Sequence, residues 1–397
     1  MNDIRDHRSF ERAAAPRRRV LFVINSLAGG GAERVMATLL SNSEEWLNRH
    51  EIALAVLDEG PRAFPLPGWL TIFQLDCAGG LLASISGLNR VVRDFAPDVT
   101  ISFLTRANLA NGAVMTKRRM PWIISERTST PAHLSSRAKQ LATKLMMRAL
   151  YPRATRVIAV SSGVASKLER GFGVSARRID VLPNPVDIDA LHASAREHDE
   201  LRIDGPYIVA VGRLVSVKNY AMLIEAFAQS KLPWRLVIAG DGPERDALKS
   251  FAAKLGIVDR VVMPGWLSNP YPVLARASVF ALSSNVEGFP NALVEALALG
   301  VPVVATNCQD GPAEIVAGKG VDEVSGVTIA DAGVLAPVGD AASYARALQL
   351  AFEVSRREDM ITAGRKRAAD YSAAAITCRY WAVIERALER TAEARTS

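Results

Sequence analysis

Two glutamates, Glu287 and Glu295, are the residues whose type and spacing first indicate chemistry in this chain. Seven residues separate them, and an apolar run at 279–282 precedes them, as in a buried parallel strand that ends in a loop. Carboxylates bind sugar hydroxyls, and the free N–H groups of a helix start favour a phosphate. These groups together suit a nucleotide sugar, although an ordinary strand–loop–helix joint with two solvated glutamates has the same spacing.

A short helix is expected to position the two carboxylates. Pro290 suits the first positions of a helix, where its missing N–H is not needed. Residues 292–299 then have a helical composition, and Gly300 and Pro302 end the segment. Glu287 is thus expected in the loop and Glu295 about one turn into the helix, so both can face one cleft.

Two cations follow another expected strand, at 207–212. Arg213 and Lys218 lie in the loop between that strand and a helix that starts at residue 220 or 221. Arginine supplies a planar fork of donors and lysine a compact charge, so the couple can clamp a diphosphate at the end of the strand. Solvated loop charges are the alternative.

The two segments together resemble glycosyltransferase family 4, which has retaining activity and the GT-B fold. Glu287 and Glu295 match its E-x7-E motif, and 212–219 matches G-R-L-x-x-x-K-[NG]. The resemblance implies that Arg213 and Lys218 bind the donor diphosphate and that Glu295 binds the ribose. It places Glu287 beside the donor sugar, with further donor contacts from Gly288, Phe289, Asn291 and Ala292.

A glycine loop follows the first expected strand, at 20–24. Gly29, Gly30 and Gly31 allow close approach to a phosphate at a helix start, although a plain tight turn is equally consistent. The family commonly has G-G-x-E-R here, and Gly30, Gly31, Glu33 and Arg34 match it. The resemblance implies that this loop approaches the donor phosphates and the acceptor.

Glu126 stands where many family members have a histidine near the donor sugar. We expect it either to orient or deprotonate an acceptor hydroxyl, with Arg127 pairing a phosphate, or to form an internal pair with Arg127.

A basic helix is expected at 137–150, where Arg137, Lys144 and Arg148 recur near helical spacing between apolar residues. One interpretation is an amphipathic face that rests on an anionic membrane. The favoured alternative is a surface helix whose apolar side packs on the core.

Strand and helix alternate along the chain, which predicts an α/β protein with doubly wound parallel sheets. With the resemblance, we expect GT-B architecture: two Rossmann-like domains that face a cleft. Residues 1–18 form a basic arm, 19–188 an acceptor-binding domain and 200–373 a nucleotide-sugar-binding domain. The last helix, 374–397, is expected to pack back on the first domain. Residues 264–267 are expected near the nucleobase.

Composition bounds the remaining possibilities. The 397 residues are 49% hydrophobic and 22% charged, which is ordinary for a globular protein. Residues 1–190 hold 26 Lys/Arg against 17 Asp/Glu, so the first half should meet an anionic partner. Three scattered cysteines, no secretory signal and no apolar run of roughly 20 residues predict a cytoplasmic protein, with peripheral contact to the inner face of the membrane left open.

The expected function is transfer of a hexose or N-acetylhexosamine from a nucleotide sugar, with UDP favoured, to a glycan or polyprenyl-diphosphate-linked acceptor in envelope polysaccharide synthesis. No cofactor or metal is expected, because Arg213 and Lys218 can stabilise the leaving diphosphate. A sugar-nucleotide epimerase or phosphorylase is the alternative on the same fold. Nucleic-acid binding is not expected, because no base-reading motif accompanies the positive charge.

Overall fold

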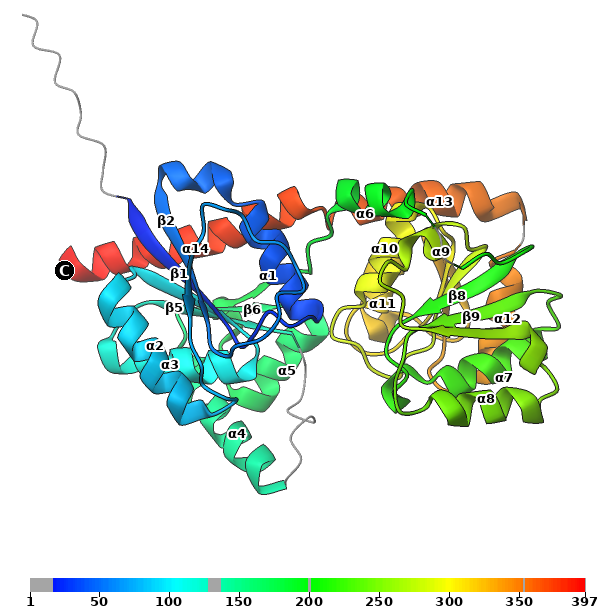
Figure 1. The fold of residues 1–397 in the computed structure, drawn as a ribbon, viewed down its shortest axis with the longest axis horizontal. Coiled ribbons are helices and arrows are strands. Elements are labelled where there is room, and N and C mark those ends of the chain that lie inside the picture. The colour runs from blue at the N-terminus through cyan, green and yellow to red at the C-terminus, as the bar shows by residue number, and fades with distance from the viewer. Residues whose placement is uncertain (1–16, 128–136, 199–200, 353, 397) are drawn as a thin grey trace, which may run out of the picture.

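The computed structural model describes residues 17–127, 137–198, 201–352 and 354–396. Two α/β domains lie side by side, each built on a seven-stranded sheet (Figure 1). The basic arm predicted at 1–18 lies outside the described residues, apart from Arg17 and Arg18. The other predicted domain limits remain predictions.

The first sheet is parallel and has the order β3-β2-β1-β4-β5-β6-β7. Strands β4 and β5 are buried along their whole length, as expected for a parallel sheet that is covered on both faces. The seven strands are β1 (Arg18–Ile24), β2 (His50–Val56), β3 (Thr71–Gln74), β4 (Val99–Phe103), β5 (Trp122–Glu126), β6 (Arg156–Ala159) and β7 (Ile179–Val181).

Helices cover both faces of this sheet. One face packs on α1 and α14, and the other on α2, α3 and α5, which gives two apolar layers. The helices of this domain are α1 (Gly31–Ser41), α2 (Leu81–Phe95), α3 (Thr105–Arg118), α4 (Arg137–Leu150) and α5 (Ser162–Phe172), with α14 (Ala373–Thr396) returning from the chain end.

The second sheet repeats the plan in the order β10-β9-β8-β11-β12-β14-β13, with β13 antiparallel at its edge. Its strands are β8 (Tyr207–Val211), β9 (Arg235–Ala239), β10 (Val261–Gly265), β11 (Val279–Leu282), β12 (Val303–Thr306), β13 (Thr328–Ala330) and β14 (Gly333–Ala336). Its helices are α6 (Ile188–Ala195), α7 (Tyr220–Ser230), α8 (Arg245–Lys254), α9 (Tyr271–Ala275), α10 (Asn291–Leu299), α11 (Pro312–Ala317), α12 (Ala341–Leu350) and α13 (Val354–Ala369).

The strand order reverses between β1 and β4 in the first sheet and between β8 and β11 in the second. Ligands of doubly wound sheets bind beyond the carboxyl ends of the strands at such points. The glycine loop 29–31 follows β1, Arg213 follows β8, and Glu287 follows β11. The topology therefore directs the predicted site residues of both domains to two strand-end crevices.

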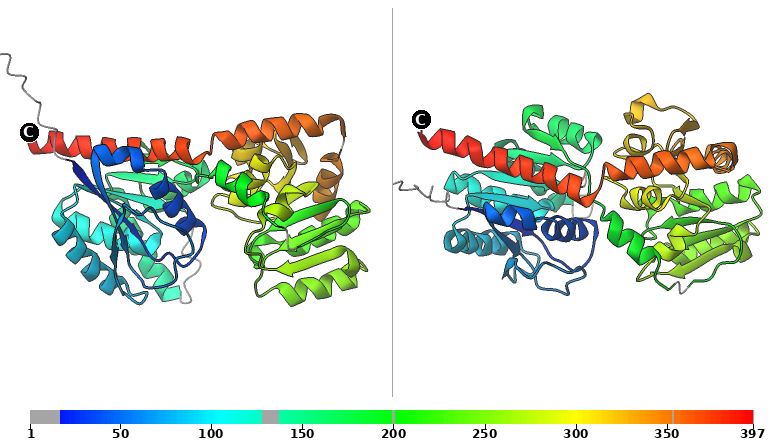
Figure 2. Two further views of the ribbon diagram at one scale, coloured as in Figure 1. Left: turned by 45° about the horizontal axis from the view of Figure 1, so that its top comes forward. Right: turned by 90° about the horizontal axis from the view of Figure 1, so that it is seen from above.

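The chain crosses between the domains twice, and the two crossings are hydrogen-bonded to each other. The Val186 N–H donates to the Tyr371 carbonyl at 2.8 Å, and the Ala373 N–H donates to the Val186 carbonyl at 2.9 Å. After the second crossing, α14 runs back along the first domain (Figure 2). Its Trp381 is buried and stacks on Trp46 with ring centroids 5.3 Å apart. This packing is the predicted return of the last helix.

Most predicted elements are confirmed, and one region differs. The strand at 279–282 is β11, and the basic helix at 137–150 is α4. No element was predicted between the two domain limits at 188 and 200, where the structure has α6. Asp187 caps that helix by accepting the Ala190 N–H at 3.0 Å, and Leu191 is buried beneath it.

Candidate active site

Glu287 and Lys218 lie together at the carboxyl edge of the second sheet. The Lys218 Nζ is 2.5 Å from the Glu287 Oε1, and the Ser284 hydroxyl donates to the same oxygen at 2.6 Å. Both side chains are mostly buried, since 24% of Lys218 and 10% of Glu287 are exposed. They meet because β8 and β11 are neighbours and both end here. The predicted convergence of the lysine and the first glutamate is therefore observed.

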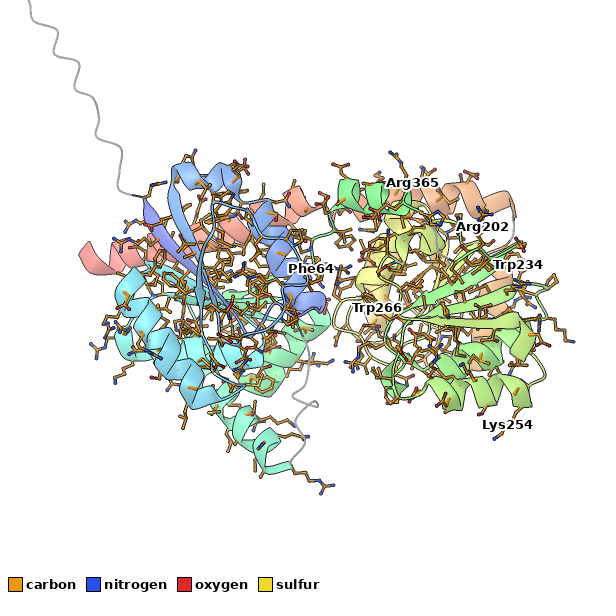
Figure 3. All side chains as sticks on the ribbon, in the orientation of Figure 1. Phe64, Arg202, Trp234, Lys254, Trp266 and Arg365 are labelled. Carbon is orange, nitrogen blue, oxygen red and sulfur yellow. The ribbon has the colours of Figure 1, made fainter. Side chains whose placement is uncertain are left out.

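Arg213 is exposed on the same edge and borders a cavity of about 260 Å³. Gly240 lines that cavity with φ +146°, and a side chain there would overlap the Gly212 carbonyl, so the loops after β8 and β9 approach closely. Trp266, 75% exposed, stands at its mouth, on the side of the second domain that faces the first (Figure 3). An arginine beside an exposed indole suits a phosphorylated aromatic ligand.

Glu295, the second glutamate, is bound by the opposite domain. The Arg34 guanidinium on α1 is 2.5 Å from the Glu295 Oε1 and donates to the Tyr271 hydroxyl at 2.7 Å. Glu295 raises the pKa of Arg34, and burial raises the pKa of Tyr271 to about 12, so both keep their protons at neutral pH. This bridge joins α1, α9 and α10 across the cleft.

The glycine loop meets the start of α10. A Cβ placed on Gly31 would lie 3.5 Å from the Asn291 Nδ2, so the amide stands at the amino end of α1. Gly29 has φ +112°, a conformation that favours glycine, and Gly30 directly precedes the helix. The structure thus brings the predicted Gly30 and Gly31 close to the predicted Asn291, although their sheets belong to different domains.

The rest of the loop before α10 spans the domain boundary. The Phe289 ring packs against the cores of both domains and lies edge-on to Tyr371, with centroids 5.5 Å apart. Gly288 and Ala292 are partly exposed on either side of it. The aromatic residue therefore contacts both domains while its neighbours stay accessible.

Glu126 ends β5 and is buried, with 2% of the residue exposed. The Tyr151 hydroxyl donates to its Oε2 at 2.8 Å, and the Arg127 backbone N–H donates to its Oε1 at 3.2 Å. The Arg127 guanidinium is also buried and donates to Asn184 and Tyr380. Glu126 is thus part of an internal hydrogen-bond network. It stands at the position where many members of the resembled family have a histidine near the donor sugar.

Several cross-domain contacts were missed by sequence reasoning. Ser162 on α5 donates to Glu314 on α11, and Lys167 on α5 pairs with Asp310. The sequence carries a weak signal for the first pair, because Ser162 closely follows the apolar run 157–160 and Glu314 lies in the turn-forming segment 311–315. No local pattern indicated Tyr271, whose hydroxyl receives the Arg34 guanidinium.

A basic cavity of about 570 Å³ opens beside these contacts, between α4 and α5 of the first domain and the loop after β12 of the second. Four cations contribute to its lining: Lys144, Arg148, Lys167 and Arg170. The Gln309 backbone at its edge accepts the Glu287 N–H at 3.4 Å. The cavity is therefore adjacent to the loop that holds Glu287.

The described residues contain neither a group of side chains suited to a metal ion nor a helix suited to crossing a membrane. Within 17–127, 137–198, 201–352 and 354–396, no three His, Cys, Asp or Glu side chains are grouped so that they could hold a metal ion. In the same parts of the chain, no helix combines the length and the apolarity of a membrane span.

Comparison with known proteins identifies the family. The model for "Glycosyl transferases group 1" matches residues 194–367, and that for "Glycosyl transferase 4-like domain" matches residues 17–185. In Campylobacter jejuni, the N-acetylgalactosamine-N,N'-diacetylbacillosaminyl-diphospho-undecaprenol 4-alpha-N-acetylgalactosaminyltransferase is 30% identical over 305 residues, which cover 74% of this chain and 81% of that protein.

A second C. jejuni protein, the GalNAc-alpha-(1->4)-GalNAc-alpha-(1->3)-diNAcBac-PP-undecaprenol alpha-1,4-N-acetyl-D-galactosaminyltransferase, is 26% identical over 372 residues, or 89% of this chain and 94% of that one. The structure of Anabaena HepE in complex with UDP aligns with a TM-score of 0.74 at 19% identity, over 93% of this chain and all of that one. Sucrose-phosphate synthase of Thermosynechococcus elongatus aligns with a TM-score of 0.76 at 17% identity, over 93% and 99%. This chain is accordingly a glycosyltransferase of family 4 with the GT-B fold.

Proposed function

We propose that the protein transfers a hexose or N-acetylhexosamine from a UDP-sugar, with retention of configuration, to a polyprenyl-diphosphate-linked saccharide or related glycan. The observation that carries this proposal is the Lys218–Glu287 pair at 2.5 Å, which stands on the same sheet edge as Arg213. A cation next to a carboxylate at a strand end can serve a diphosphate and a sugar hydroxyl of one ligand.

The charged residues of the site have different roles in this proposal. Arg213 and Lys218 neutralise the diphosphate as it departs, which lowers the barrier where negative charge develops. Glu287 binds the donor sugar, and Glu295 binds the ribose hydroxyls once the donor displaces Arg34. The leaving phosphate accepts the proton of the acceptor hydroxyl during front-side attack on the anomeric carbon. The reaction in this form requires no metal ion or other cofactor.

UDP as the carrier is supported by relatives. HepE of Anabaena was solved with UDP, and the names of the two C. jejuni relatives specify N-acetylgalactosamine transfer. The same two names specify acceptors linked through diphosphate to undecaprenol.

The basic cavity supports an acceptor that carries a diphosphate. Its lining holds four cations against two carboxylates, Asp310 and Asp322, and Lys167 is paired with Asp310, so the cavity keeps a net positive charge for a diphosphate. Its edge adjoins the loop of Glu287, so an acceptor bound there would direct its sugar towards the donor. Nucleic acid would meet the same charge, but the cavity offers one aromatic ring, Phe172, and no row of stacking surfaces.

Helix α4 supports peripheral membrane contact. Leu141 is 61% exposed and Leu145 55% exposed, in a helix that also carries Lys144 and Arg148. The favoured expectation was a surface helix whose apolar side packs on the core. Met147 is buried and fits this expectation, but the two exposed leucines do not. Exposed leucines between cations suit an anionic membrane surface, where a polyprenyl acceptor resides.

The experiment is a transfer assay with purified protein, a panel of UDP- and GDP-sugars and a synthetic polyprenyl-diphosphate saccharide. We expect product with one UDP-sugar, and at least a hundredfold loss of turnover in Arg213→Ala, since a cation on a leaving group is worth about that much. Near-normal turnover in that variant would end the proposed assignment. A sugar isomer or sugar phosphate formed without acceptor would instead indicate an epimerase or phosphorylase.

A second arm tests the acceptor site. The double variant Lys144→Ala/Arg170→Ala should raise the acceptor KM about tenfold and leave the donor KM unchanged, because it removes two charges from the cavity alone. Lys254→Ala, on the far edge of the second domain (Figure 3), is the matched control. The same saccharide without diphosphate should not distinguish the variants; if it does, the cavity does not bind the diphosphate.

A further inference from the structure

Arg127 sits at the end of a chain of hydrogen bonds that reaches the donor loop. Its guanidinium donates to the Asn184 Oδ1 and, at 2.7 Å, to the Tyr380 hydroxyl. The Asn184 Nδ2 in turn donates to the Asn291 Oδ1 at 2.7 Å. We propose that Arg127 and Asn184 are positioning residues that fix which end of the Asn291 amide faces the donor; this rests on the proposed UDP-sugar site.

The direction of the chain follows from the chemistry of arginine. A guanidinium has only N–H donors, so the atom of Asn184 that faces it must be the carbonyl oxygen. The NH₂ of Asn184 then points the other way and must meet an acceptor, which is the carbonyl oxygen of Asn291. One donor-only group therefore sets the orientation of two amides in series.

The NH₂ group of Asn291 is thereby turned away from Asn184 and towards the amino end of α1. Its Nδ2 stands 3.5 Å from the place where a side chain on Gly31 would begin, at the amino end of α1. Asn291 is partly exposed, so a ligand can reach this amide. Phosphate oxygens accept hydrogen bonds from such a group, whereas a carbonyl oxygen in the same place would repel them.

The chain also depends on both domain crossings. Asn184 lies in the first crossing, and Tyr380 lies on α14, which follows the second. Arg127 and Asn184 are buried, with 8% and 6% exposed, and the Arg127 guanidinium covers the Phe103 ring at 4.6 Å. Water is thus largely excluded from the first two links, and their polarity cannot easily be reversed by solvent.

Asn184→Asp is the decisive substitution, because it is nearly isosteric and adds an ion-pair partner for Arg127. A carboxylate has no N–H to offer, so Asn291 must turn and donate to it, which presents the Asn291 carbonyl to the cleft. We expect the Tm to be unchanged or higher, and the Kd for the UDP-sugar, measured by calorimetry, to rise about tenfold to a hundredfold, which is the value of a hydrogen bond to a charged group.

Two variants of Arg127 provide the matched pair. Arg127→Lys keeps a donor-only cation and should retain most of the affinity, whereas Arg127→Met should lose affinity, though less than Asn184→Asp, because it frees the Asn184 amide without forcing it to turn. Asn291→Ala removes the proposed donor directly, and combining it with Asn184→Asp should add no further loss. Equal affinities of the lysine and methionine variants would overturn the inference.

UDP-sugar binding by Arg213→Ala tells a failure of this inference apart from a failure of the proposed function. If Arg213→Ala abolishes UDP-sugar binding while Asn184→Asp binds as the parent protein does, the polarity argument is wrong and the donor site stands. If Arg213→Ala binds the UDP-sugar normally, the proposed donor site is itself wrong. A fall in kcat of Asn184→Asp with an unchanged Kd would also overturn the inference, since a reversed amide acts on donor binding.

Discussion

The two glutamates of one short motif are held in different ways. Glu287 is bound within its own domain by Lys218 and Ser284, whereas Glu295 is bound across the cleft by Arg34. The first environment forms when the second sheet folds, because neighbouring strands supply its parts. The second environment exists only while the domains are closed. Glu287 therefore belongs to a preformed centre, whereas the contact of Glu295 with Arg34 is one that a ligand can replace.

Lys218→Ala should have the largest effect, because it breaks the preformed centre. It removes a cation from the expected leaving group and leaves Glu287 without its ion-pair partner. We expect kcat to fall about 10³-fold, at the upper end for loss of one group that stabilises developing charge. Steady-state kinetics of sugar transfer provide the measurement, with the exposed Lys249→Ala on α8 as the control. A loss below tenfold would contradict a preformed centre at Lys218.

Glu287→Gln should have the next largest effect. It keeps the shape of the side chain but removes the charge that pairs with Lys218, so we expect kcat to fall about 10²-fold with a smaller change in donor KM. The same kinetic assay measures it, and Glu44→Gln, exposed in the first domain, provides the reference. If only the donor KM changed, Glu287 would contribute to ground-state binding alone.

Glu295 and Arg34 should respond in opposite directions, which tests the second half of the comparison. Glu295→Gln should weaken UDP-sugar binding about tenfold, because it loses a charged acceptor for ribose hydroxyls. Arg34→Ala should strengthen binding about threefold or leave it unchanged, since a competing partner of Glu295 is gone. Calorimetric Kd values decide this. A large loss in Arg34→Ala would mean that the arginine itself binds the donor.

The smallest effect lies away from both glutamates, at His50 beneath α14. Burial against Trp381, with ring centroids 5.0 Å apart, lowers the pKa of His50 below its usual 6.5. Below pH 6.5 the unfolded chain binds this proton and the folded chain does not, so acidification lowers the free energy of unfolding until the folded pKa is reached. The slope is at most about 1.4 kcal/mol per pH unit.

Urea denaturation between pH 5 and 7 measures how the free energy of unfolding changes with pH. His50→Gln should flatten this pH dependence. Lys218→Ala should lower kcat by the same factor with His50 or Gln at position 50, because the two sites lie in different domains. An unchanged slope in His50→Gln would place the titrating group elsewhere.

Local pattern was sufficient for most elements. The apolar run before Glu287 became β11, and the Pro290 and Gly300 signals enclosed α10. Helix α6 was not predicted, although Asp187 caps its start and five of its eight residues are apolar. Exposed Leu141 and Leu145 fit the membrane interpretation of the basic helix and not the favoured one, because helical periodicity does not state what covers a face.

The sequence by itself determined the two motifs, the alternation of strands and helices, and hence the sheet edges at which Arg213, Lys218 and Glu287 appear. Sequence spacing was sufficient to place these three residues, because the carboxyl ends of parallel strands lie at the same edge of a sheet. Only the tertiary structure decided the partners of Glu295, Glu126 and Asn291. Glu295 pairs with Arg34 of the other domain, Asn291 with Asn184 of the first crossing, and Glu126 with Tyr151 further along its own domain. Contacts of single polar side chains between distant segments leave no periodic pattern in the sequence.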